Sequence, residues 1–500
     1  MAEIYTAFMT AVSPESLLAS IMGVALGIIF GALPGLTPTM GVALLLPLTF
    51  TMKTVEAFSM ILGMYVAGVY GGCISAILIG TPGTVAAAAT ILEGPKMTAK
   101  GESMRALEMA TIASFTGGIF SAVVLIIFAP ALAKVAMEFG SPEYFALAFF
   151  GLTVVASLTS GAILKGIISC LIGLFIATIG IDPVTGVLRN TFGIPNLFSG
   201  VAIVPALIGL FAVSQVMVSV EESLCGVIIK ETTESKSKLS FSDLWISKWN
   251  FLRSSAIGTI VGIIPATGVS TAAFVAYSEA KRFSKTPELF GTGTLEGIAA
   301  SESANNAVTG GAMVPLLTLG IPGDTVTAVM LGGLMIQGLA PGPLLFRDFP
   351  VVVYGIFIAL LIANIFMLIQ GLIAIRFARR IVLIPTQILM PVVLTLCAVG
   401  GYATNNSVFD LALVAVFGVL GYYMMKNGFP LAPLLLAMIL APIAESNFRR
   451  TMMLSGGDPT ALVESPIAAG VLLVSLGVLI KTVRDEFIFY KRQAKTSVAA

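Results

Sequence analysis

Small hydroxyl residues beside Pro and Gly are the side chains of this sequence best suited to binding chemistry. They gather at four places, 33–38, 80–84, 264–268 and 320–325, each between apolar runs. Hydroxyls and the free N–H groups at helix starts donate hydrogen bonds to anions, whereas unwound carbonyls bind cations. The residues that we expect to bind a substrate are Pro34, Gly35, Thr37, Pro38, Thr39, Gly80, Thr81, Pro82, Gly83, Thr84, Pro265, Thr267, Gly268, Ser270 and Thr325.

These breaks have an ordinary interpretation as well. Gly and Pro are common in membrane helices, and a Thr hydroxyl can bond to a carbonyl of its own helix. That interpretation is the better one for a single break. Four breaks in two matching pairs favour a binding site, because irregular backbone inside a bilayer needs protein or water to satisfy its polar groups.

A second polar group interrupts an apolar run at 301–306, with the sequence Ser-Glu-Ser-Ala-Asn-Asn. Oxygen ligands suit Na⁺, and an ionisable residue within a membrane is a functional candidate. The residues expected to hold a coupling cation, preferably Na⁺, are Ser303, Asn305, Asn306, Gly320, Gly323 and Asp324. The alternatives are that Glu302 lies at a solvated helix end and that Asp324 caps a helix. Proton coupling would have to use one of these two carboxyls.

Composition excludes several classes of protein. The 500 residues include 27 Lys+Arg, 26 Asp+Glu and no His, and 57% are hydrophobic. So few charges cannot cover a soluble protein, which indicates an integral membrane protein. The net charge of +1 argues against nucleic-acid binding, and the absence of His excludes imidazole catalysis. No phosphate-binding loop is present, and we expect neither an enzyme with catalytic residues nor a bound cofactor.

Long apolar runs must position these residues. Most approach the length of a spanning helix, which predicts an all-α polytopic membrane protein with about 11–12 transmembrane segments. The runs are 57–79, 107–130, 143–160, 166–181, 200–220, 295–319, 350–375, 384–400, 408–424, 431–444 and 466–483.

The two halves of the chain resemble each other at four ordered places, with offsets that rise from 231 to 247 residues. This pattern predicts two inverted repeats with re-entrant or broken helices. The expected units are a first repeat at 1–220, a cytoplasmic connector at 221–253, a second repeat at 254–445, and a final transmembrane helix with a cytoplasmic tail at 446–500.

Basic residues predict the orientation, because they favour the cytoplasm. Arg253 and the cluster at 281–285 are both basic and separated by a short apolar segment. A hairpin that enters and returns on one side explains this spacing. About 12 residues per arm reach roughly 18 Å, near the bilayer midplane. Its tip would lie at 264–268, and a matching hairpin at 16–52 would enter from the opposite face.

Three strings carry a family resemblance: Gly31-Ala-Leu-Pro-Gly-Leu-Thr-Pro-Thr-Met-Gly41, Tyr70-Gly-Gly with Gly80-Thr-Pro-Gly-Thr84, and Gly320-Ile-Pro-Gly-Asp324. On these strings the chain resembles the large membrane subunit of the tripartite tricarboxylate transporter family, the TctA type. The resemblance implies a multi-pass carrier of the bacterial cytoplasmic (inner) membrane that imports citrate-like carboxylates with an ion gradient, usually Na⁺. It also implies two partners, a periplasmic solute-binding protein and a small four-helix membrane subunit.

The sequence therefore predicts an ion-coupled secondary active transporter, a symporter with alternating access and an elevator-like sliding of the hairpins. The alternatives are a passive anion channel and a carrier of another small organic anion. A membrane enzyme lacks a catalytic constellation, and a structural anchor would not explain paired breaks. The lipid bilayer surrounds the chain, and a homo-oligomer is left open.

Overall fold

The structure, a computed structural model, describes residues 2–157, 163–182, 184–223, 237–264, 269–378, 380, 386–480 and 484. It confirms the all-α polytopic fold. The described residues form only two strands, β1 (Gly180–Ile181) and β2 (Leu188–Arg189), which are two residues long and pair with each other. Within the described chain, seven helices are long and apolar enough to cross a membrane. The number of 11–12 segments stays a prediction.

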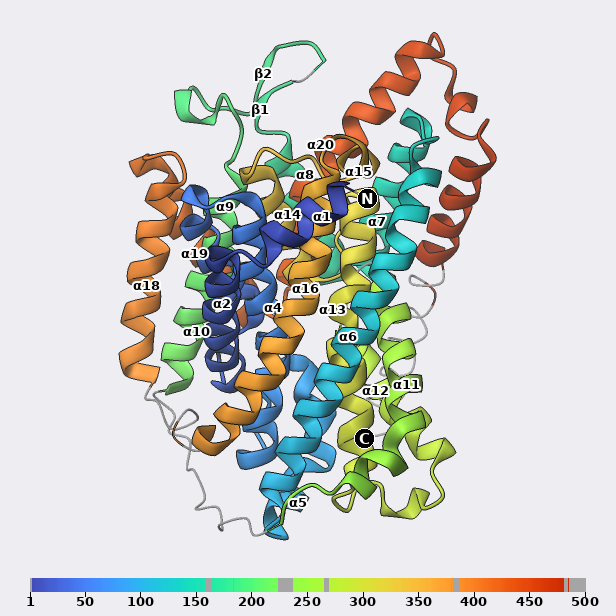
Figure 1. Ribbon diagram of the computed structural model, residues 1–500. Coiled ribbons are helices and arrows are strands. Elements are labelled where there is room, and N and C mark those ends of the chain that lie inside the picture. Colours follow the sequence, from blue (N-terminus) through green and yellow to red (C-terminus); the bar gives the residue numbers. More distant parts are fainter. Residues whose placement is uncertain are drawn as a thin grey trace, which may run out of the picture.

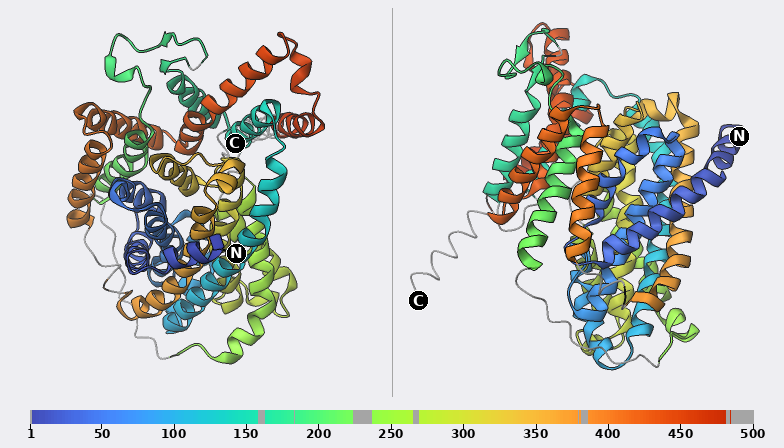
Figure 2. Two further views of the ribbon diagram at one scale, coloured as in Figure 1. Left: turned by 45° about the horizontal axis from the view of Figure 1, so that its top comes forward. Right: turned by 90° about the vertical axis from the view of Figure 1, so that its left-hand side faces the viewer.

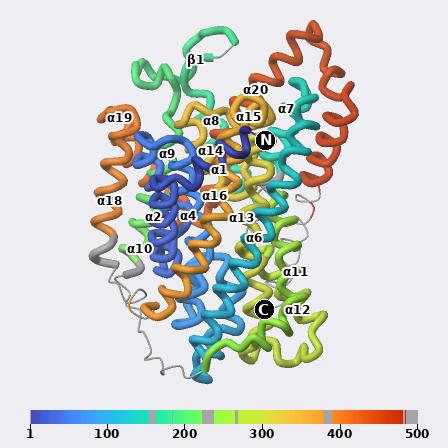
Figure 3. The backbone as a smooth tube through the Cα atoms, in the orientation of Figure 1, coloured from blue at the N-terminus to red at the C-terminus, as the bar shows by residue number. Residues whose placement is uncertain are grey.

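One set of helices packs tightly around two buried helices, and we call it the core group (Figure 1). The helices are α2 (Pro14–Ala32), α4 (Thr54–Ile79), α6 (Ser103–Ala136), α11 (Phe241–Ile263), α12 (Val269–Phe283), α13 (Leu295–Leu319) and α16 (Pro350–Ala374). Helices α4 and α13 are buried along nearly their whole length, which explains why polar residues of α13 lie in the interior. Figure 3 traces α13 near the middle of the bundle.

A second set, the outer group, packs mainly on itself. Helix α20 contacts α7 and α8, and α19 contacts the π-helical segment η5 and α10. In the right-hand view of Figure 2, α8 and α10 (green) and α20 (red-orange) lie on one side of the molecule, and α1 (dark blue) and α16 (orange) lie on the other. The members are α7 (Ser141–Ser157), α8 (Ile163–Ala177), α9 (Ile203–Leu207), η5 (Ile208–Val213), α10 (Ser214–Ser223), α18 (Thr386–Ala403), α19 (Val408–Lys426) and α20 (Leu431–Leu454).

Short elements join these helices. They are α1 (Ala2–Ala11), α3 (Pro38–Leu45), η1 (Pro47–Thr51), η2 (Val85–Ala88), η3 (Thr90–Leu92), α5 (Gly94–Ala99), η4 (Pro195–Leu197), η6 (Pro287–Leu289), α14 (Thr325–Ile336), α15 (Pro343–Asp348), η7 (Ile375–Phe377) and η8 (Pro459–Leu462). Helix α14 contacts members of both groups.

All four predicted breaks separate helices. They lie between α2 and α3, between α4 and η2, between α11 and α12, and between α13 and α14. Helices α4 and α13 end alike, because Gly80 and Gly320 adopt left-handed φ angles of 70° and 71° that favour glycine. Helices α11 and α12 pack against each other as a hairpin in the lower part of Figure 1. Its tip residues 265–268 lie outside the described residues.

Equivalent glycines bring backbones together in both halves. A Cβ atom at Gly31 would lie 2.2 Å from the carbonyl oxygen of Gly68, and one at Gly262 would lie 2.7 Å from that of Val308. The two pairs are offset by 231 and 240 residues, in line with the motif offsets. These contacts agree with the predicted repeat, and the inversion of the two halves stays a prediction.

The predicted unit boundaries fall partly within helices. Helix α11 begins at Phe241, so the described end of the 221–253 connector is helical and continuous with the hairpin. Helix α20 runs through the boundary predicted at 445. The cytoplasmic side of the connector stays a prediction.

Candidate functional site

Helix breaks from both halves of the chain line one cavity of about 590 Å³. Of the residues expected to bind a substrate, the cavity brings together Thr37, Pro38, Thr39, Thr84, Ser270 and Thr325. They come from segments up to 288 residues apart in the sequence, so only the fold makes them neighbours. The hydroxyls of Thr39 and Thr325 lie 3.1 Å apart and join the two halves by a hydrogen bond.

Helices α3 and α14 begin at this cavity with capping side chains, and the first residues of α12 and α20 line it as well. Thr37 caps α3, because its Oγ1 accepts a hydrogen bond from the Met40 N–H at 3.1 Å, and Pro38 follows at the first helical position. Asp324 caps α14 by accepting from the Thr327 N–H at 2.8 Å. Helix starts carry partial positive charge and free N–H groups, so this arrangement suits an anion.

Asp324 has more partners than a simple cap requires. Its Oδ2 accepts from the Tyr65 hydroxyl at 2.5 Å, and its Oδ1 accepts from the Thr327 hydroxyl at 2.7 Å. The structure thus gives Asp324 the capping role that the sequence left as an alternative. Asp324 is also among the residues that line the cavity.

The opposite wall of the cavity comes from the outer group. It contains one amide, Gln215 on α10, and otherwise apolar or backbone surface. The remaining lining residues of this wall are Phe211, Met425, Gly428, Phe429, Pro430, Leu431, Ala432 and Leu436. Among the described residues that line the cavity there is no Arg or Lys, so hydroxyls, the Gln215 amide and backbone N–H groups are the polar donors available to an anion.

Other predicted substrate residues shape the backbone instead of lining the cavity. A Cβ atom at Gly83 would lie 2.0 Å from the carbonyl oxygen of Gly31, so the second break of this half packs on the end of α2. Gly35 accepts a hydrogen bond from the Ser219 hydroxyl at 3.1 Å. Pro34, Gly80, Thr81 and Pro82 belong to the same two breaks and are absent from the lining. Pro265, Thr267 and Gly268 lie outside the described residues.

The predicted cation residues divide into two places. Gly320, Gly323 and Asp324 lie at the break between α13 and α14. Ser303, Asn305 and Asn306 lie within α13, fully buried, and none of them lines the cavity.

Sequence reasoning missed four residues: Tyr65 bonds to Asp324, Thr90 and Ser114 bond to Glu302, and Gln215 lines the cavity. Each lies in a helix or turn whose local sequence gives no signal for binding. Packing between distant helices brings them to the site.

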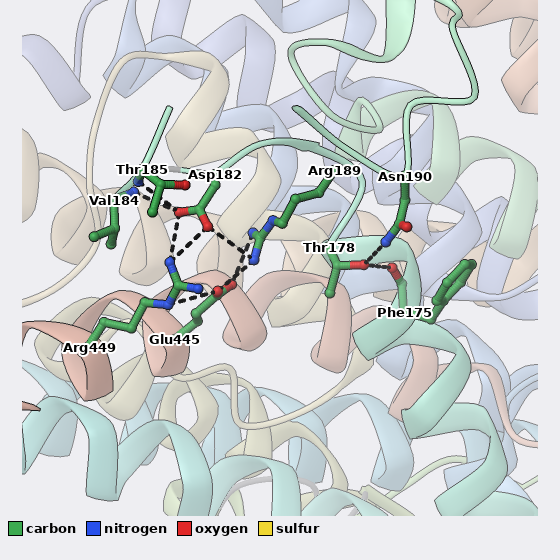
Figure 4. Close-up of polar contacts among 9 residues, drawn as sticks. All are labelled: Phe175, Thr178, Asp182, Val184, Thr185, Arg189, Asn190, Glu445 and Arg449. Atoms are coloured by element: carbon green, nitrogen blue, oxygen red, sulfur yellow. Dashed lines mark hydrogen bonds and ion pairs between the residues drawn. The ribbon is translucent and has the colours of Figure 1, made fainter. Parts of the chain in front are cut away.

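A charged cluster marks the end of the molecule near β1 and β2 (Figure 4). Arg449 donates to both carboxylate oxygens of Asp182 at 2.8 Å, and Arg189 donates to Glu445 at 2.7 Å. The backbone N–H of Val184 and the Arg449 guanidinium hold the pKa of Asp182 well below its usual range. The cluster ties the loop at 178–202 to α20, and its charges pair with one another.

Comparison with known proteins identifies the family. The model of the tripartite tricarboxylate transporter TctA family matches residues 17–436. An uncharacterized 52.8 kDa protein in the TAR-I ttuC′ 3′ region of Agrobacterium vitis is 38% identical over 480 residues, which cover 95% of this chain and 94% of that protein. A protein in the TAR-II ttuC′ 3′ region of the same organism is 39% identical over 219 residues, 44% of this chain and 90% of its own length. No solved structure matches. The chain belongs to the tripartite tricarboxylate transporter TctA family.

Proposed function

We propose that this chain is the translocating subunit of a carrier that imports citrate-like carboxylates across the bacterial cytoplasmic membrane. The observation that carries the proposal is the cavity at which α3 and α14 begin, in a chain of a tricarboxylate transporter family. A carboxylate there receives backbone N–H groups and the hydroxyls of Thr39, Thr84 and Thr325. The substrate is held by dipoles, without a buried cationic side chain.

Access to the cavity would alternate through movement between the two groups of helices. Helices α3 and α14, which contact α4 and α13 of the core group, supply hydroxyls to one wall, and α10, α19 and α20 of the outer group supply the mostly apolar wall. An apolar wall forms few hydrogen bonds, so the two surfaces can slide past each other at a low enthalpic cost. The motion proposed is an elevator-like displacement of the core group, with its hairpins, against the outer group.

A cation gradient, preferably of Na⁺, would drive uptake as a symport. Asp324 borders the cavity and repels an anionic substrate when it is ionised, so an accompanying cation offsets this repulsion. The partners proposed are a periplasmic solute-binding protein that delivers the substrate and a small four-helix membrane subunit.

Reconstitution into liposomes tests the proposal. We expect labelled citrate to accumulate against its gradient when an inward Na⁺ gradient is imposed, and excess unlabelled citrate to compete. A panel of other di- and tricarboxylates then identifies the preferred substrate, including another small organic anion. Uptake that never exceeds equilibrium and does not saturate would indicate a passive anion channel and refute the carrier. Parallel vesicles with and without the two partner proteins separate a missing partner from a missing activity.

A further inference from the structure

A carboxylate without a cationic partner lies in the middle of the bundle. Glu302 on α13 is fully buried and accepts hydrogen bonds from the Thr90 hydroxyl, the Ser114 hydroxyl at 3.4 Å and the Asn305 amide at 3.3 Å. None of the ion pairs formed by the described residues includes Glu302. An ionised carboxylate at such a depth is costly unless a positive charge accompanies it.

Several buried polar atoms of α13, and one of α16, lack hydrogen-bond partners among the described residues. They are Ser303 Oγ, Asn305 Oδ1, both side-chain polar atoms of Asn306, and Asn364 Oδ1 on α16. All four residues are fully buried. Leaving a buried polar group unpaired destabilises a protein, and buried polar groups in folded proteins are nearly always paired. Four of these five atoms are oxygens, and a bound cation would supply a partner for such oxygens.

Two neighbouring glycines of α6 bring α13 and Asn364 of α16 close to that helix. Asn306 follows Glu302 by one helical turn and shares its face. A Cβ atom at Gly118 of α6 would lie 1.8 Å from Asn364 Oδ1, and one at Gly117 would lie 2.0 Å from a backbone carbonyl of α13. Because these two residues have no side chain, the backbone of α13 packs against Gly117 and the Asn364 amide packs against Gly118.

We propose that Glu302, Ser303, Asn306 and Asn364 bind one Na⁺ ion, and we call these residues the α13 cation site. Carboxylate, amide and hydroxyl oxygens are hard ligands suited to Na⁺. One carboxylate balances one positive charge, and the described residues contain no group of three acidic, Cys or His side chains such as a divalent metal would favour. Asp324 is outside this site, since Tyr65 and Thr327 already satisfy its oxygens.

The α13 cation site has two links to the cavity. Asn305 donates to the Val69 carbonyl at 3.4 Å, and Val69 lines the cavity. Thr90 bonds to Glu302 and belongs to the segment that carries Thr84 at the cavity wall. Binding of the ion would therefore hold in place the Val69 carbonyl and the segment that carries Thr84, and both of these residues line the cavity. This role in coupling rests on the proposed function, whereas binding of the ion does not.

The experiment measures binding of Na⁺ without transport. The purified full-length protein in detergent is unfolded by heat in NaCl, KCl or choline chloride at one ionic strength. We expect only Na⁺ to raise the midpoint with a saturating dependence, and Asn364→Leu to raise the half-saturating Na⁺ concentration at least tenfold. Asn447→Leu is the matched control, because the Asn447 amide on α20, like that of Asn364, donates to its own helix at 2.8 Å. The control should keep the Na⁺ dependence of the parent.

Equal midpoints in the three salts, or an unchanged Na⁺ dependence in Asn364→Leu, would overturn the α13 cation site. Asn364→Ser, a smaller polar replacement, repeats the test if the Leu variant does not fold. Citrate uptake distinguishes the two proposals. A Na⁺-specific midpoint that depends on Asn364, in a protein that moves no carboxylate, would uphold the site and refute the proposed function. Na⁺-driven uptake with no Na⁺-specific midpoint would uphold the function and refute the site.

Discussion

Replacing Thr325 with Val removes a hydroxyl that both lines the cavity and bonds to Thr39 at 3.1 Å. The substrate loses one donor, and the buried Thr39 hydroxyl loses its partner. A lost hydrogen bond of this kind costs about 1–3 kcal/mol, which corresponds to a roughly 5- to 150-fold weaker affinity. Valine is close to threonine in size, so the cavity keeps its shape.

The assay is saturation of citrate uptake in proteoliposomes, together with the thermal midpoint of the purified protein. The half-saturating citrate concentration should rise in Thr325→Val, and Thr39→Val with the double variant completes a mutant cycle. We expect a coupling of about 0.5–1.5 kcal/mol, because the two hydroxyls bond to each other. Thr116→Val is the control, since that hydroxyl bonds only to its own helix, at 2.7 Å to the Ile112 carbonyl. If the citrate affinity of Thr325→Val stays within twofold of that of the parent, the Thr325 hydroxyl does not bind the substrate and this assignment of the cavity is refuted.

Three further outcomes are expected. Cysteines introduced at Ser237 and Ser497 should react with an impermeant reagent only from the cytoplasmic side, and labelling from outside would reverse the proposed orientation. Because the folded-state pKa of Asp182 is lowered, its contribution to stability is present above the unfolded value of 3.8 and is lost as pH falls toward the folded value. Thermal midpoints should thus fall in acid, and less steeply in Asp182→Asn. Gly262→Ala places a Cβ atom 2.7 Å from a backbone oxygen and should cost about 1–3 kcal/mol of stability in denaturant titrations, whereas Gly470→Ala, with open space around it, should not.

The breaks could be predicted from the sequence because their signals are local. A Thr-Pro pair starts α3, and Gly-Ile-Pro-Gly-Asp ends α13 and caps α14, as residue preferences at helix ends require. The division of the predicted cation residues follows from the length of α13, because the helix continues from Asn306 to Leu319, roughly 20 Å away from the break. The position of Asn364 could not be predicted in this way, since its amide lies beside Gly118 of α6 only in the folded chain. Such contacts join positions far apart in the chain, and a single sequence does not contain them.

The glycine contacts of the core group have a mechanical consequence. Where Gly31 meets Gly68 and Gly262 meets Val308, backbone touches backbone with no side chain between them to change rotamer. Because no side chain can repack at these contacts, we expect the joined helices to move together as one unit. A large displacement should therefore occur at the boundary between the two groups of helices, where Phe429 and its neighbours line the cavity. Crosslinks placed across that boundary should therefore arrest turnover, whereas crosslinks within a glycine joint should leave it unchanged.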